Sequence, residues 1–236
     1  MQRSFKSVPL SVFLVLALSL VAQLAWKTSR VPTAPEAGDF PPPPGMALLQ
    51  LASLGDPVPL AKLSMLYLQT FDSQVGNVAA YKKLNYEHLE GWLKLILELD
   101  PDGQYPLFVA TRFYAEVPDK AKRQRMMDFV FREFFKDPER RWPSLAYQTL
   151  VVQHQLKDLP LAQTYAHAIY LHTNGEDVPL WVKLLEPAIL EEMGELDKSR
   201  AMLQESMARG LVKSPDDMRA FQNHLKWIDR QLAGKN

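Results

Sequence analysis

The chain contains no cysteine among its 236 residues. It therefore forms no disulfide, zinc–thiolate centre, catalytic thiolate or lipidated cysteine anchor. It also lacks net charge, because 27 basic side chains balance 27 acidic ones. A neutral chain is not expected to bind nucleic acid, whose phosphates attract strongly basic proteins.

Recognisable catalytic motifs are absent as well. The chain has no Gly-x-Ser-x-Gly, no glycine-rich phosphate loop and no His-Glu-x-x-His. His167 and His172 are five residues apart and would not share a helix face, which disfavours a metal pair. We expect no enzyme activity, no cofactor and no metal site. Hydrophobic residues make up 47% and charged residues 23%, as in a folded protein.

An uncharged run of 20 residues, 7–26, lies near the amino terminus. As a helix it would extend about 30 Å, enough to cross the hydrocarbon core of a bilayer. We therefore expect a transmembrane helix at 7–26, bound to the lipid bilayer and preceded by a short cytoplasmic tail at 1–6. The alternative is a cleaved signal peptide that starts with Arg3 and Lys6. The only fitting cleavage site, Ala17–Ser19, falls inside the apolar run.

The remaining chain is expected to face outward. A short basic tail normally stays in the cytoplasm, although Lys27 and Arg30 nearly balance Arg3 and Lys6. The absence of any Asn-x-Ser/Thr sequon disfavours an endoplasmic-reticulum lumen. We expect a single-pass protein of the bacterial inner membrane whose main domain lies in the periplasm.

Proline is the abundant residue, with 18 copies against 10 glycines. Six prolines fall within positions 31–45, a density that excludes helix and favours extended polyproline II. We interpret residues 27–45 as a stiff linker. The alternative is a docking site for a proline-binding module.

From residue 46 onward, apolar residues recur at helical spacing. Four prolines follow one another at intervals of 37, 36 and 36 residues: Pro106, Pro143, Pro179 and Pro215. Each precedes an apolar run, as expected for proline in the first turn of a helix. A second series five residues earlier is expected to end the preceding helix: Asp100-Pro101, Asp137-Pro138 and Asn174-Gly175.

The prolines divide this part of the chain into units of 36–37 residues. A third series marks a turn within each unit: Asn85-Tyr86-Glu87, Lys157-Asp158-Leu159 and Gly194-Glu195-Leu196, with Pro118-Asp119 in the remaining unit. Residues 84–101 and 193–209 resemble the second helix of a tetratricopeptide (TPR) repeat. That resemblance implies an all-α TPR-like solenoid of helix–turn–helix units over 72–236. The period exceeds the 34 residues usual in that family. We expect an amino-terminal helical cap at 46–71, divided at Gly55-Asp56-Pro57.

The last helix is expected at Pro215–Leu232, ending at Gly234. Pro187 falls eight residues into a repeat helix, so we expect a kink or break there.

The resemblance implies that the first helix of each unit lines a groove for partner segments. Alignment of the units on their prolines places six residues in this groove: Phe108, Arg112, Glu116, Thr149, Gln153 and Trp181. The four polar residues are the stronger candidates, because a core would not favour them. Phe108 and Trp181 could equally be core residues.

Charge is segregated along the chain. The basic segment, residues 119–141, holds eight basic and five acidic residues. The acidic segment, residues 176–197, holds seven acids and one lysine. Both are interpreted as exposed helix faces, or as the poles of a solenoid whose basic end meets anionic lipid or an acidic partner.

These features predict a membrane-anchored protein–protein interaction or scaffold protein that assists the assembly or stability of a membrane or secretion complex. The alternative is an all-α accessory subunit of a respiratory or oxidising membrane enzyme complex. A polar pocket containing histidine would favour the alternative. A groove lined by Arg, Thr and Gln without histidine would favour the scaffold.

Overall fold

The computed structural model describes residues 9–29, 41–72, 84–173, 178–212 and 214–234. It divides into two compact units, Met1–Glu36 and Ala37–Asn236. All secondary structure in the described residues is helical, which confirms the all-α fold class.

The first unit contains α1, Leu10–Ser29. Every side chain from Ser11 to Trp26 is exposed. Across the described ranges, no helix combines the length and the apolarity needed to cross a membrane. The spanning helix at 7–26 stays a prediction, and residues 1–8 lie outside the described part.

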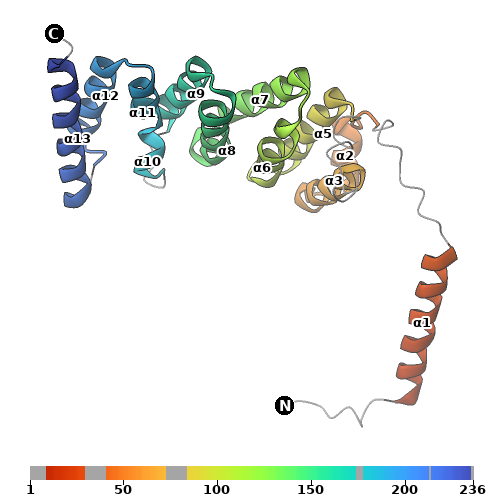
Figure 1. Ribbon diagram of the computed structural model, residues 1–236. Helices are drawn as coiled ribbons and strands as arrows, with labels where there is room; N and C mark the ends of the chain where they lie inside the picture. The colour runs from red at the N-terminus through yellow and green to blue at the C-terminus, as the bar shows by residue number, and fades with distance from the viewer. Residues whose placement is uncertain (1–8, 30–40, 73–83, 174–177, 213, 235–236) are drawn as a thin grey trace. The chain divides into compact units, whose positions relative to one another are not determined.

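The second unit is an array of helices that follow one another in chain order (Figure 1). They are α2 (Met46–Ala52), α3 (Pro57–Asp72), α5 (Tyr86–Leu99), α6 (Tyr105–Arg112), the 3-10 helix η2 (Tyr114–Glu116), α7 (Lys120–Phe134), α8 (Pro138–Val151), the π-helical turn η3 (Val152–Leu156), α9 (Leu159–His172), α10 (Leu180–Lys183), α11 (Leu185–Glu192), α12 (Leu196–Ala208) and α13 (Pro215–Ala233).

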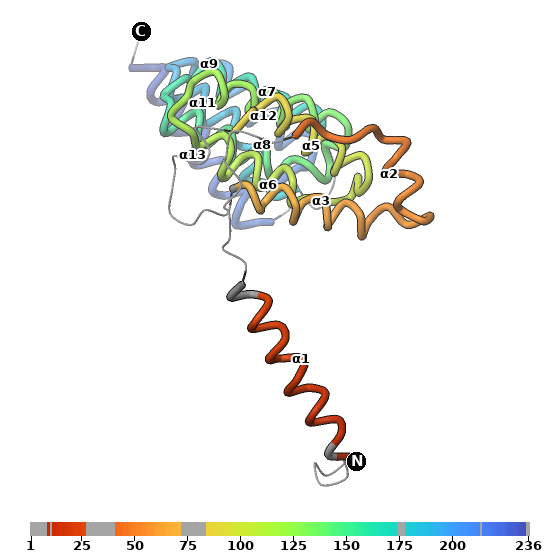
Figure 2. The backbone as a smooth tube through the Cα atoms, turned by 90° about the vertical axis from the view of Figure 1, so that its right-hand side faces the viewer, coloured from red at the N-terminus to blue at the C-terminus, as the bar shows by residue number. Residues whose placement is uncertain are grey.

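Packing in this unit joins elements that are close in the chain. The contacts run from α3 to α5, from α7 through α8 to α9, and from α11 through α12 to α13. The side view separates α3 and α6 from α7 and α9 (Figure 2), so the helices form two layers. Helices of this kind bury one face against each neighbour in turn.

Four helices begin at side-chain caps in which an oxygen accepts a backbone N–H. The capping residues are Asn85 for α5, Asp119 for α7, Asp158 for α9 and Ser214 for α13. Gly194, at φ 79°, follows α11 in the left-handed conformation that favours glycine. The turns expected at these positions are confirmed.

The division of the amino-terminal cap is also confirmed. Between α2 and α3, Gly55 has a φ of 94°, and Asp56 Oδ1 accepts the backbone N–H of Val58 at 3.2 Å. The last helix, α13, ends at Gly234 as expected. The helix expected around Pro187 is interrupted at Leu184, which separates α10 from α11.

One proline expectation is wrong. Helix α8 begins at Pro138, not at Pro143, and α7 already ends at Phe134. Pro138 occupies the first helical position, where its missing N–H has no partner to lose. Pro143 lies inside α8, where its ring crowds the preceding turn and it has no N–H to donate.

The other prolines in the series lie at helix starts as predicted: Pro106, Pro179 and Pro215. Pro101 follows the end of α5, also as predicted. Asn174-Gly175 lies outside the described residues.

The end of the proline-rich segment packs against α5. Trp92 Nε1 donates a hydrogen bond to the Pro41 carbonyl at 2.9 Å. Gly91 makes room for the ring of Pro43, because a Cβ at position 91 would lie 2.8 Å from Pro43 Cγ. Residues 41–45 therefore belong to the second unit, whereas most of the predicted linker lies outside the described residues.

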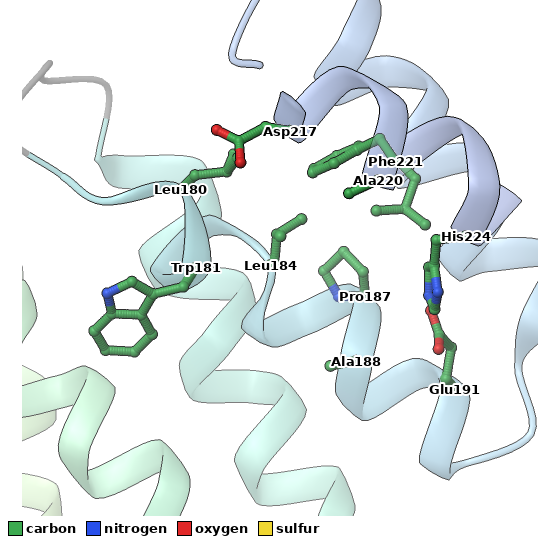
Figure 3. A pocket seen from close by; sticks show the side chains of 11 residues that line it. Leu180, Trp181, Leu184, Pro187, Ala188, Glu191, Asp217, Ala220, Phe221 and His224 are labelled. Carbon is green, nitrogen blue, oxygen red and sulfur yellow. The ribbon is translucent and has the colours of Figure 1, made fainter. Parts of the chain in front are cut away.

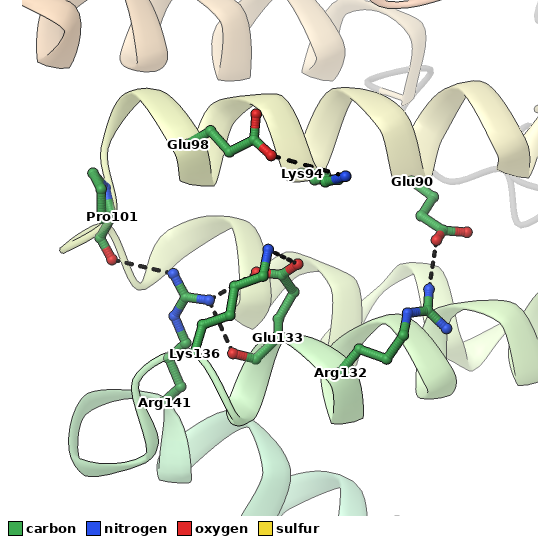
Figure 4. A network of polar contacts seen from close by, with 8 residues as sticks. All are labelled: Glu90, Lys94, Glu98, Pro101, Arg132, Glu133, Lys136 and Arg141. Atoms are coloured by element: carbon green, nitrogen blue, oxygen red, sulfur yellow. Dashed lines mark hydrogen bonds and ion pairs between the residues drawn. The ribbon is translucent and has the colours of Figure 1, made fainter.

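The basic segment is tied into the array by acidic residues (Figure 4). Arg132 Nη2 contacts the Glu90 carboxylate at 2.5 Å. Arg125 Nη1 contacts the same carboxylate at 3.0 Å. Arg141 Nη1 lies 2.7 Å from Glu133 Oε2, and both side chains are buried. These three arginines therefore form ion pairs that connect helices, which weakens the interpretation of the basic segment as a free basic pole.

Candidate functional site

The structure exposes four of the six residues predicted for the groove. Phe108 and Arg112 lie on α6, Glu116 ends η2 and Trp181 lies on α10. Phe108 is 44% exposed and Trp181 51% exposed. The alternative interpretation of these two aromatic residues as core is therefore wrong.

The other two predicted groove residues are buried. Thr149 is 0% exposed, and its hydroxyl donates to the Leu145 carbonyl of its own helix at 2.8 Å. Gln153 is 5% exposed, and its Nε2 donates to Glu192 Oε1 at 3.0 Å. Hydrogen bonding allows both polar side chains to lie in the interior. Neither lines an accessible groove.

Arg112 is the centre of a polar and aromatic cluster between α6 and α8. Its guanidinium carbon lies 3.5 Å from the ring centroid of Tyr147 and 5.8 Å from that of Phe108. Both are cation–π distances. The Tyr147 hydroxyl in turn donates to Glu116 Oε1 at 2.8 Å. The exposed cation is thus held in position by two neighbouring elements.

Two further exposed rings extend this cluster. Phe108 stacks on Tyr105 at 6.1 Å between centroids and meets Phe113 edge-on at 6.2 Å. Gln69 of α3 donates to the Tyr105 hydroxyl at 2.6 Å. We call these residues the aromatic–arginine surface: Tyr105, Phe108, Arg112, Phe113 and Tyr147. Sequence reasoning missed three of them, although Tyr105 and Phe113 directly adjoin Pro106 and Arg112.

Tyr147 remains a hydrogen-bond donor over a wide pH range. Burial raises the pKa of its hydroxyl, and the hydrogen bond to Glu116 and the charge of that carboxylate raise it further. Arg112 acts in the opposite direction and lowers the pKa. The net upward shift of the pKa keeps the phenol neutral, and able to donate to Glu116, at a pH where an ordinary tyrosine begins to ionise.

A polar pocket of about 420 Å³ adjoins this surface. Its lining residues are Thr111, Ala115, Glu116, Arg123, Met127, Gln148, Val151, Gln155 and Leu156. The π-helical turn η3 contributes two of them, and such turns are frequent at functional sites. The polar side chains of the lining are those of one arginine, one glutamate, one threonine and two glutamines.

A larger pocket of about 610 Å³ lies between α10–α11 and α13 (Figure 3). Most of its lining is apolar: Leu180, Trp181, Leu184, Pro187, Ala188, Leu203, Ala220 and Phe221. Its polar lining residues are Glu191, Asp217 and His224. Sequence reasoning did not anticipate this pocket, which depends on how α13 packs.

The acidic segment is not simply a solvated face. Glu186 is buried, and its carboxylate lies 2.9 Å from His167 Nδ1. Glu191 pairs with His224 Nε2 at 2.9 Å. Within the residues that the structure describes, no group of three or more His, Asp or Glu side chains could hold a metal ion.

Comparisons with protein-family models, with curated proteins and with solved structures find no match to this chain. Functional inference therefore depends on the geometry of the two pockets and of the aromatic–arginine surface.

Proposed function

We propose that this chain binds segments of other proteins through the aromatic–arginine surface. The observation that carries the proposal is Phe108, which is 44% exposed yet held between the rings of Tyr105 and Phe113. Exposed apolar patches on folded proteins mark interaction sites. Tyrosine and arginine are also enriched among residues that dominate binding energy.

The surface is pre-organised for binding. Arg112 rests on Tyr147, and Tyr147 is fixed by Glu116. A side chain that is already ordered loses less conformational entropy when a partner binds. The neighbouring polar pocket offers amide and hydroxyl groups suited to the main chain of an extended segment.

We infer that the second unit is a TPR-like repeat array. The support is the 36–37-residue spacing of four prolines together with packing that joins helices close in the chain. The aromatic–arginine surface lies on α6 and α8, the first helices of two successive units. In repeat arrays such helices line the face that receives partners.

We further propose that α1 anchors the chain in the bacterial inner membrane and that the second unit serves a membrane or secretion complex from the periplasm. The support is the uncharged run at 7–26 and the exposure of every side chain from Ser11 to Trp26. Carbonate extraction should leave the chain in the membrane pellet. A carboxy-terminal alkaline phosphatase fusion should be active. An inactive fusion would indicate the opposite orientation, with the second unit in the cytoplasm.

The binding proposal is tested by placing a photo-crosslinking phenylalanine analogue at Tyr105 in the full chain. Crosslinked protein partners are expected at this position. The same analogue at Phe135, which is 44% exposed at the end of α7, is the matched control. Phe108→Ala with Arg112→Ala should lower crosslinking at Tyr105 at least five-fold without loss of helicity. Equal crosslinking at both positions would contradict the proposal.

A further inference from the structure

The apolar pocket has the dimensions of a binding site. Its volume of about 610 Å³ falls within the range of ordinary ligand pockets. Leu184 and Pro187 form one wall, and Phe221 of α13 forms the facing wall (Figure 3). Leu203 of α12 also contributes. When an apolar group binds, water leaves this apolar lining, and the free energy of that release favours binding.

The pocket exists because α13 packs against only part of the array. The helix packs most closely on α12 and shares a small apolar cluster that is separate from the main core. This cluster consists of Leu196, Leu203, Val212, Phe221 and Ile228. The side of α13 that faces α10 and α11 is therefore left with room for another group.

The polar groups of the pocket are mainly acidic. Asp217, in the first turn of α13, and Glu191, on α11, lie at different edges of the pocket (Figure 3). His224 is paired with Glu191 at 2.9 Å, and no lysine or arginine is among the lining residues. An occupant that carries positive charge beside its apolar group would be electrostatically complementary.

We propose that this pocket receives a bulky apolar side chain from a protein segment that has lysine or arginine beside it. Trp181 at the border of the pocket meets Trp142 of α8 edge-on at 6.2 Å. Aromatic side chains thus continue from the exposed Trp181 to the partly buried Trp142 on the helix that carries Tyr147. The inference rests on the proposed function, because both assign the chain a protein segment as ligand, but it concerns a separate site.

The probe for this site is a fluorescent 14-residue amphipathic peptide with leucine on one face and lysine on the other. A second peptide has glutamate in place of every lysine. Binding is measured by anisotropy to the full chain in nanodiscs of neutral phosphatidylcholine, with empty discs as the blank. The lysine peptide is expected to bind at least five-fold more tightly than the glutamate peptide.

Asp217 and its neighbour provide a matched pair of charge reversals. Asp217→Lys and Asp216→Lys both remove an acid from the first turn of α13, but only Asp217 lines the pocket. Because one exposed charge pair contributes up to about 1 kcal/mol, Asp217→Lys should weaken the lysine peptide about five-fold. Asp216→Lys should change its affinity less than about two-fold.

Filling the pocket provides an independent test. Ala220→Trp should weaken the lysine peptide at least ten-fold, whereas Ala201→Trp, at an exposed position of α12 outside the pocket, should not. Equal affinity for both peptides, or equal effects of the two tryptophans, would overturn the proposal. So would self-association that Ala220→Trp abolishes, since a second copy would then be the occupant. If the lysine peptide did not bind while crosslinking at Tyr105 persisted, this inference would be overturned and the proposed function would not be.

Discussion

The buried ion pair between Glu133 and Arg141 should contribute strongly to the cohesion of the array. Arg141 Nη1 contacts Glu133 Oε2 at 2.7 Å and the Glu133 carbonyl at 2.9 Å, while Nη2 reaches the Pro101 carbonyl at 3.4 Å (Figure 4). The two side chains are only 4% and 5% exposed. One guanidinium thus joins α7, α8 and the turn after α5.

Arg141→Met removes these contacts and leaves a buried carboxylate. Breaking a buried pair from one side costs about 3–5 kcal/mol. Lys136 Nζ still contacts Glu133 Oε1 at 2.7 Å and offsets part of the loss. We therefore expect the free energy of unfolding to fall by about 3 kcal/mol, at the lower end of that range. Urea unfolding of the full chain, followed by circular dichroism at 222 nm, measures this change.

Two further variants separate the ion pair from mere loss of side-chain volume. Glu133→Leu combined with Arg141→Met removes both charges and should restore stability to within about 1 kcal/mol of the original chain. Lys94→Met breaks an exposed contact of 3.9 Å with Glu98 and should cost less than about 0.5 kcal/mol. If Arg141→Met were no more destabilising than Lys94→Met, the assignment of a cohesive role to the pair would be refuted.

Three other substitutions test local features of the fold. Gly91→Ala should displace the ring of Pro43 from α5 and expose the Trp92 indole, whose fluorescence acrylamide should then quench more strongly than in the original chain. Pro143→Ala should remove the crowding of the proline ring against the preceding turn of α8 and raise the unfolding free energy by about 1–3 kcal/mol, measured by urea titration. Unchanged values would contradict the respective reasoning. Burial raises the pKa of Tyr165 to about 12, so stability should fall by about 2–3 kcal/mol as pH rises from 10 to 12. The sign follows because the unfolded chain releases the phenolic proton first, and Tyr165→Phe should abolish this component of the pH dependence.

Much of the helical pattern could be predicted from sequence because caps and turns are local. Asn85, Asp119 and Asp158 act on N–H groups two or three residues away. Local sequence signals do not decide whether α8 starts at Pro138 or at Pro143. Either proline fits a first turn, and the chain places the second inside α8 at the loss of one hydrogen bond.

The candidate site was less predictable because its contacts join distant segments. Gln153 was expected on the surface as a polar side chain, but its partner Glu192 lies 39 residues further along the chain. Arg112 was correctly expected to be exposed, whereas the ring it rests on, Tyr147, lies on another helix, α8, 35 residues further along the chain. Alignment of the repeats identifies equivalent positions but does not specify which side chains meet between units.

Unequal cohesion along the array leads to a final prediction. The second apolar cluster comprises five buried residues, whereas the main core extends from Leu49 to Ile189. Helix α13 should therefore open without the rest of the unit, since local stability follows buried apolar contacts. Hydrogen exchange read by mass spectrometry should show faster exchange in α13 than in α5, α7 or α8. Phe221→Ala should accelerate exchange in α13 alone, while Leu93→Ala should accelerate it in α5 and its neighbours. Uniform protection across all of these helices would show a single cooperative unit and contradict the separation of the two clusters.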